Sequence, residues 1–123
     1  MKKDNLCLLK SETFAIRIVK LYNYLKDNKK EFVLSKQILR SGTSIGANIS
    51  ESEYAISRDD FISKMHIAVK ECSETLFWLK LLKNTQYISQ KEFDSINQDC
   101  DEICKILVAS IKTAKNKKGK DKK

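Results

Sequence analysis

The stretch from Gln37 to Ser52, QILRSGTSIGANISES, constrains the fold more than any other part of this chain, because its residues repeat with the period of an α-helix. Gly42 and Gly46 lie one turn apart, and each costs about 1 kcal/mol relative to alanine inside a helix. We therefore predict that another backbone packs closely against this helix. The residues expected on its buried face follow one another at spacings of four, three and four: Ile38, Gly42, Ile45 and Ile49.

A polar stripe lies beside this apolar face on the same predicted helix. Arg40, Asn48 and Glu51 are expected to make hydrogen-bonded and charged contacts between helices or between subunits. A solvated helix face is the simpler alternative, and a ligand site is a third. The full stripe comprises Gln37, Arg40, Ser44, Asn48 and Glu51.

Composition favours helices throughout the chain. The 123 residues include no proline and three glycines, whereas turn-rich sandwiches and barrels use both residues freely. A chain of this length buries about two-thirds of its unfolded surface, which suffices for one domain. The apolar run at Leu6–Leu9 is too short for a signal peptide, and Lys80 interrupts the longest apolar cluster. We therefore expect a soluble cytoplasmic protein that does not enter a membrane.

Helical periodicity and capping residues predict four helices joined by short connections, which most economically form an all-α, antiparallel up-down-up-down bundle. Ser89 and Glu92 form a capping box at the start of the last helix. We assign residues 11–114 to the bundle domain, 1–10 to a flexible segment and 115–123 to a lysine-rich disordered tail. The predicted helices run from Ser11 to about Asn28, from Ser35 to about Tyr54, from Ser57 to Leu82 or Lys83, and from Ser89 to about Ala114.

The third predicted helix is apolar on more than one face near its end. A monomeric bundle needs one apolar stripe per helix, so this surplus indicates either a thick core at one end or a subunit interface. We favour the interface, with Phe77 and Trp78 in it, and therefore a homo-oligomer. The apolar residues concerned are Leu76, Phe77, Trp78, Leu79, Leu81 and Leu82.

From about Phe14 to about Ile111 the chain resembles the bacterial four-helix bundle proteins, also known as the large-subunit ribosomal RNA intervening-sequence protein family. It departs from many relatives at Leu39, where they have a basic residue, at Gly46, where they have proline, and at Ser52, where they have glycine. The resemblance is carried by Gln37, Arg40, Ser44, Ile45, Ala47, Asn48, Ile49 and Glu51, followed by Phe61, Ala68, Glu71, Glu74 and Leu79.

This resemblance implies an antiparallel bundle that assembles as a ring-like homopentamer and is often encoded inside ribosomal RNA intervening sequences. A related protein, the accessory variability determinant of diversity-generating retroelements, is a basic pentameric bundle that binds nucleic acid and partners a reverse transcriptase. The resemblance brings no enzymatic activity with it. Fold and function are separate inferences, because one fold serves many functions.

The end of the chain carries six of its eight net positive charges, because residues 112–123 contain seven lysines and a single acidic residue, Asp121. Lysines without aromatic residues or arginines can neutralise phosphates but cannot read bases, so binding would be salt-sensitive and largely independent of sequence. A solvated, disordered tail is the alternative. An oligomer would gather several such segments and gain avidity. The lysines are Lys112, Lys115, Lys117, Lys118, Lys120, Lys122 and Lys123.

No catalytic arrangement is apparent in the sequence. Ser44 has no histidine partner that the sequence places nearby, and His66 is the only histidine. Cys100 and Cys104 share a helix face, but a zinc site would need two further ligands. We expect these residues, with Cys7 and Cys72, to be reduced thiols, and we expect no cofactor or metal.

Two functions therefore compete. The first is a non-enzymatic oligomeric scaffold that binds RNA or DNA electrostatically through its lysine-rich ends and supports a ribonucleoprotein or a reverse transcriptase. The second is a protein-interaction module that does not use nucleic acid. An enzyme built into the bundle core ranks below both, because the chain lacks the Glu and His motifs of bundle metal sites.

Overall fold

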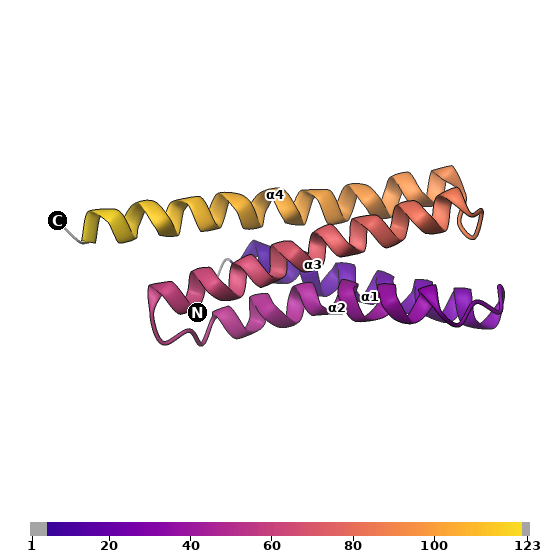
Figure 1. Cartoon of the computed structure of the whole chain (residues 1–123), viewed down its shortest axis with the longest axis horizontal. Coiled ribbons are helices and arrows are strands. Elements are labelled where there is room, and N and C mark those ends of the chain that lie inside the picture. The colour runs from indigo at the N-terminus through magenta and orange to yellow at the C-terminus, as the bar shows by residue number, and fades with distance from the viewer. Residues whose placement is uncertain (1–4, 122–123) are drawn as a thin grey trace.

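The computed structural model describes residues 5–121 and is all-helical over that range (Figure 1). Consecutive helices run in opposite directions, and the connections at residues 28–33 and 85–89 lie at the same end. The described part of the chain contains no helix long and apolar enough to cross a membrane. The helices are α1 (Leu6–Asp27), α2 (Leu34–Ser52), α3 (Arg58–Asn84) and α4 (Gln90–Asp121).

The four helices close around one core. Helix α1 packs against α2, α2 against α3 and α3 against α4, and α4 returns to α1, so that α1 and α3 lie diagonally across the bundle. The predicted all-α four-helix bundle is confirmed. Each helix contributes side chains that are at most 1% exposed, including Ile18, Ile45, Leu79 and Leu107. The predicted buried face of α2 is also confirmed, because Ile38, Gly42, Ile45 and Ile49 are all buried.

Helix α1 begins earlier than the sequence suggested. Asn5 Oδ1 accepts the backbone N–H of Leu8 at 3.0 Å and caps the helix, so residues 6–10, which we had assigned to a flexible segment, are helical. Ser11, the predicted cap, lies inside the helix and is completely buried. Its hydroxyl donates to the Leu8 carbonyl at 2.8 Å. Residues 1–4 of the predicted flexible segment lie outside the described range.

Helix α2 begins at Leu34 and is capped by a residue that the sequence reading missed. The buried carboxylate of Glu31 accepts backbone N–H groups of Val33 at 3.2 Å, Leu34 at 3.0 Å and Ser35 at 2.7 Å. Desolvation raises the pKa of Glu31, but the hydrogen bonds outweigh it and hold the pKa below its usual 4.5. Ser35, the predicted cap, instead donates its hydroxyl to the Glu31 carbonyl at 2.9 Å.

We expect Glu31→Gln to lower the free energy of unfolding by about 1 kcal/mol at pH 7, because the amide replaces a charged cap. The folded pKa of Glu31 is lowered, so its stabilisation is present above pH 4.5 and is lost as pH falls through the folded pKa. The difference between variant and parent should therefore shrink below pH 4.5 in urea unfolding. An unchanged difference at low pH would contradict this role, and Glu12→Gln, at an exposed site on α1, is the matched control.

The predicted caps of α3 and α4 are confirmed. Ser57 Oγ accepts the Asp60 N–H at 3.0 Å. At the start of α4, Ser89 Oγ accepts the Glu92 N–H at 3.1 Å while Glu92 Oε1 accepts the Ser89 N–H at 2.8 Å. These reciprocal bonds satisfy two backbone donors that a helix start leaves unpaired.

Helix α4 continues to Asp121, past the predicted end near Ala114, and projects beyond the other three helices (Figure 1). The assignment of residues 115–121 to a disordered tail therefore differs from the structure. A helix that is already packed extends without a new nucleation cost, and lysine is a good helix former, which explains the extension. The last two residues of the predicted tail lie outside the described range.

Close packing at the two glycines joins α1 to α2. A Cβ placed on Gly42 would lie 2.7 Å from Ile18 Cγ1, and a Cβ on Gly46 would lie 3.1 Å from Ser11 Oγ. The first distance is far below van der Waals contact, so Gly42 is the tighter of the two positions. A close approach to this helix is therefore present and α1 makes it, through the Ile18 side chain at Gly42 and through the side chain and carbonyl of Ser11 at Gly46.

Candidate nucleic-acid and subunit interfaces

The projecting end of α4 carries the first candidate surface. Ile111 and Ala114 are the last buried residues of the helix, while Lys112, Lys115 and Lys117 are exposed. The backbone of Lys118 and Lys120 is helical, whereas Lys122 and Lys123 lie outside the described residues. Because the buried residues stop at Ala114, the helix beyond it presents Lys115 and Lys117 to solvent.

An open groove of about 520 Å³ runs beside this end of α4, against the start of α3. Phe61 and Ile106 supply apolar lining, and Arg58 and Lys117 supply positive charge from the two helices. Positively charged residues from two helices therefore border the same groove. Such a surface attracts phosphate without reading base identity.

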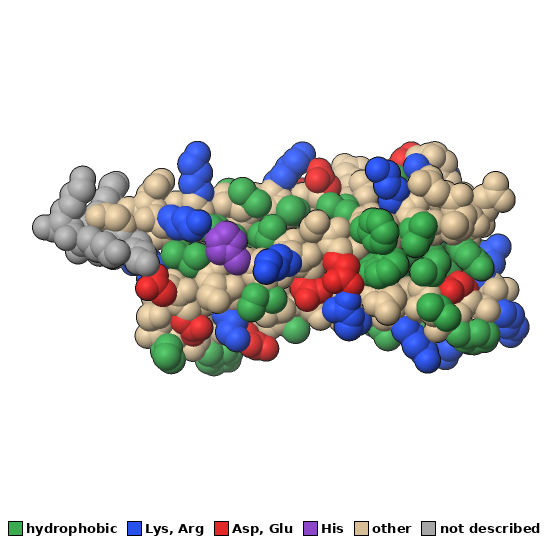
Figure 2. All heavy atoms as spheres, in the orientation of Figure 1, with side chains coloured by type: hydrophobic (Ala, Val, Ile, Leu, Met, Phe, Trp, Pro, Cys, Tyr) green, Lys and Arg blue, Asp and Glu red, His purple; other side chains and the backbone are tan. Residues whose placement is uncertain are grey.

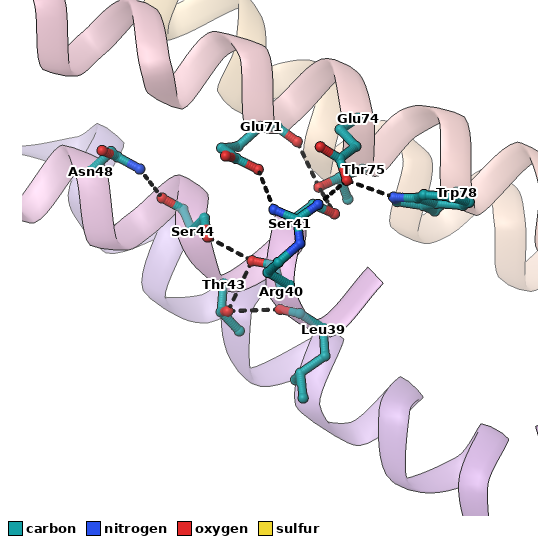
Figure 3. A network of polar contacts seen from close by, with 10 residues as sticks. All are labelled: Leu39, Arg40, Ser41, Thr43, Ser44, Asn48, Glu71, Glu74, Thr75 and Trp78. Carbon is teal, nitrogen blue, oxygen red and sulfur yellow. Dashed lines mark hydrogen bonds and ion pairs between the residues drawn. The ribbon is translucent and has the colours of Figure 1, made fainter. Parts of the chain in front are cut away.

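A charged network joins α2 to α3 at the second candidate surface (Figure 3). Arg40 pairs with Glu74, and its Nη1 lies 3.6 Å from Glu71 Oε1. Trp78 Nε1 donates to Glu74 Oε2 at 3.0 Å. Glu71 Oε1 is buried without a hydrogen-bond partner, so its contact with Arg40 is a charge interaction only. The Arg40 side chain is 52% exposed, so solvent weakens these pairs.

The other polar residues of α2 bond differently from one another. Asn48 Nδ2 donates to the Ser44 carbonyl at 2.9 Å and Ser44 Oγ to the Arg40 carbonyl at 2.7 Å, both within α2 (Figure 3). Within the chain Asn48 bonds inside its own helix, so a contact of Asn48 between subunits stays a prediction. Ser41 Oγ and Thr75 Oγ1 lie 2.9 Å apart and link α2 to α3 inside the core.

Glu51 reaches α3 from the last turn of α2. Its Oε1 accepts from Lys64 Nζ at 2.8 Å. Hydrogen bonding to Glu51, together with the charge of that carboxylate, raises the pKa of Lys64 above its usual range. Arg40 and Glu51 thus bridge the same pair of helices at different heights, which helps to fix the register of α2 on α3.

Phe77 faces outward on α3, and Trp78 beside it is half-buried against the core. Phe77 is 57% exposed, and its ring meets that of Trp78 edge to face with centroids 5.1 Å apart. Figure 2 shows apolar side chains gathered over α3 and α4 in the half nearer the α3–α4 connection. On α1, Leu9 and Ile16 are 59% and 57% exposed. The chain therefore presents apolar side chains on two helices that lie diagonally across the bundle.

The four cysteines are free thiols, and the pKa values of three of them, Cys7, Cys72 and Cys104, are raised. Burial, followed by the charge of Cys72, raises the pKa of Cys7 to about 11. Hydrogen bonding to Cys100 and burial raise that of Cys72, and burial raises that of Cys104. Such thiols are poor nucleophiles. Within residues 5–121, no group of three or more His, Cys, Asp or Glu side chains is placed to hold a metal ion, and His66 is exposed.

Residues 3–109 match the model of the family described as 23S rRNA-intervening sequence protein. The chain belongs to this family. The resemblance inferred from the α2 and α3 residues is thereby confirmed. The match ends at residue 109, so the lysine-rich end of α4 lies outside the part of the chain that defines the family.

A solved structure from the family is closely similar to this chain. It is a protein of unknown function from the S23 ribosomal protein family of Bacteroides thetaiotaomicron, with 58% sequence identity and a TM-score of 0.88. The similarity covers 90% of this chain and 99% of the other. No curated protein matches the sequence. The comparisons thus establish family and fold, and link the family by its description to ribosomal RNA.

Proposed function

We propose that this protein is a non-enzymatic oligomeric scaffold that binds RNA or DNA electrostatically and without strong sequence preference. The observation that carries the proposal is the projecting end of α4, a helical rod with exposed lysines beyond the core. Phosphate neutralisation needs cations that are accessible to the nucleic acid, and this helix end supplies them. The scaffold acts in the cytoplasm, with a reverse transcriptase or another ribonucleoprotein component as its protein partner.

Oligomerisation is supported by the two apolar surfaces on different sides of the bundle. A contact between the α3 surface of one subunit and the α1 surface of the next is head-to-tail, and such contacts generate rings when the rotation closes. Exposed side chains such as Phe77 and Ile16 would be buried in it. We propose a ring of about five subunits, in line with the family resemblance. The ring multiplies the basic ends and adds avidity.

The direct test is binding of the full chain to fluorescein-labelled single-stranded RNA and duplex DNA of several sequences, followed by anisotropy. We expect measurable binding to all of them at 50 mM salt, about the low end of the range in which phosphate contacts dominate. Absence of binding to every nucleic acid at this salt would overturn the proposal. The protein-interaction module without a nucleic-acid role would then be the better account.

We expect Phe77→Glu to reduce the oligomer mass toward the 14.2 kDa of one chain, because a charge would replace the most exposed aromatic of α3. Size-exclusion chromatography with light scattering measures the change. Tyr54→Glu is the matched control, since Tyr54 is 84% exposed beside the α2–α3 connection, at the other end of α3 from Phe77. Equal masses for the two variants would place the interface elsewhere.

A further inference from the structure

The positive charge of the bundle is concentrated at the end that carries the α1–α2 and α3–α4 connections. Residues 20–36 contain five lysines and two acidic residues, and residues 80–94 contain three lysines and two acidic residues. The two ranges together carry a net charge of +4. Residues 112–123 contribute +6 of the total of +8, so the residues outside these three ranges carry −2. Figure 2 shows Lys and Arg side chains gathered at the end with the two connections, opposite the projecting end of α4.

An open cavity of about 690 Å³ lies between the two connections at this end. This volume falls within the range of about 300–1,000 Å³ typical of small-ligand pockets. Its lining combines aromatic rings, cations and amide groups: Tyr24, Tyr87, Lys29, Lys83, Asn84 and Gln86. These are the groups that bind a phosphate, stack on a base and hydrogen-bond to its edge.

Aromatic rings lie beneath or beside the lysines at this end. Lys29 Nζ lies 5.9 Å from the centroid of the Tyr24 ring, and Lys26 Nζ lies 5.5 Å from that of Tyr22. Phe32, in the α1–α2 connection, is 52% exposed. Aromatic rings and lysines therefore lie together at the end of α1 and in the connection that follows it, whereas the lysine-rich end of α4 contains no aromatic residue.

The acidic residue in the cavity lining is already occupied by the helix cap. Glu92 accepts the Ser89 N–H at 2.8 Å, and its pKa lies below its usual range because of the Ser89 hydrogen bonds and, to a lesser extent, the charge of Lys29. Glu92 therefore stays ionised at neutral pH, and Lys29 and Lys83 leave the cavity lining with a net charge of +1.

We infer that this connection end, comprising Tyr24, Lys29, Lys30, Phe32 and the cavity beside them, is a second nucleic-acid site that stacks bases of a single strand. The inference rests on the proposed nucleic-acid function and assigns it a part that the α4 lysines lack. Duplex bases are not accessible to stacking, so this end favours unpaired strands. The α4 end accepts either form, because it contacts phosphates alone.

The test compares full-length variants in anisotropy titrations with a 20-nucleotide adenine single-stranded DNA and its abasic counterpart of equal charge. Lys29→Gln with Lys30→Gln should weaken binding of both probes about tenfold, through two lost phosphate contacts. Tyr24→Leu should weaken binding of the adenine strand at least fivefold and leave the abasic strand unchanged, because only the former stacks. Lys70→Gln with Lys105→Gln, at exposed sites away from both ends, is the control with the same charge change.

The outcomes separate this inference from the proposed function. The second site would be overturned if the connection-end variants bound both probes as tightly as the control variant. If a variant neutralised at Lys112, Lys115 and Lys117 lost affinity in the same titrations, the proposed scaffold function would still hold. Loss with the connection-end variants alone would support the second site and remove the α4 end from the account. Failure of the unaltered protein to bind either probe would overturn both. Circular dichroism confirms that each variant is folded.

Discussion

Gly42→Leu is expected to lower the free energy of unfolding by about 3 kcal/mol and the melting temperature by roughly 10 °C, the largest stability loss of any exchange considered. A Cβ at this position would lie within 3.0 Å of three side-chain carbons of Ile18. Ile18 is fully buried and cannot move aside without disturbing its own neighbours. Thermal unfolding followed by circular dichroism measures the effect.

Two further variants distinguish steric crowding at Gly42 from a general effect of replacing a glycine in a helix. Gly119→Ala introduces a Cβ with nothing within 4 Å, so it should not lower the melting temperature. Shortening the neighbour, as in Ile18→Ala, should make the effect of Gly42→Ala smaller, since the two side chains compete for the same space. If Gly42→Ala melted at or above the temperature of the parent, the close approach of α1 to α2 would be wrong.

Replacing Lys112, Lys115 and Lys117 by glutamine is expected to weaken nucleic-acid binding about 100-fold at 0.1 M salt and to make its salt dependence shallower by about 3 on duplex DNA. The three side chains are exposed, so stability and oligomer mass should not change. The loss should be equal for unrelated sequences, because phosphate contacts carry no sequence information. Anisotropy titrations across a salt series measure both quantities.

The control for this variant removes the same charge from the middle of the bundle, with glutamine at Lys64, Lys70 and Lys105. Two of these pair with carboxylates, Lys64 with Glu51 and Lys105 with Asp101. We expect their loss to change affinity less than threefold, through net charge alone. Equal losses in the two variants would mean that overall charge, rather than the projecting helix, drives binding.

Much of the fold follows from sequence pattern, because apolar spacing and side-chain caps act locally. Ser57 and the Ser89–Glu92 box begin their helices as predicted, and the buried stripe of α2 lies where its period of 3.6 placed it. The start of α1 was predicted wrongly. Asn5 and Ser11 both have side chains suited to capping, and the structure places Asn5 at the cap and Ser11 inside the helix beside Gly46. Local preference ranks such residues equally.

The candidate surfaces depend more on tertiary placement. The ion pair of Arg40 with Glu74 joins two helices. The sequence predicted a polar contact for Arg40 between helices or subunits, but it did not identify the partner. The capping role of Glu31 was not predicted, because an acidic residue in a loop before a helix has no distinctive sequence pattern. Only the folded structure brings three backbone N–H groups to its carboxylate. The cavity beside Tyr24 and Lys29 arises from two connections that are distant in sequence, so no local pattern reveals it.

The central claim is that several basic ends, gathered on one oligomer, bind nucleic acid together. Its most direct test is the slope of log K against log salt for the unaltered protein on a 40-nucleotide single-stranded RNA, with the mass measured by light scattering in the same buffer. We predict a mass several times 14.2 kDa and a slope steeper than about −5, which is what seven lysines of a single chain would supply. A single-chain mass, or no binding at low salt, would contradict it.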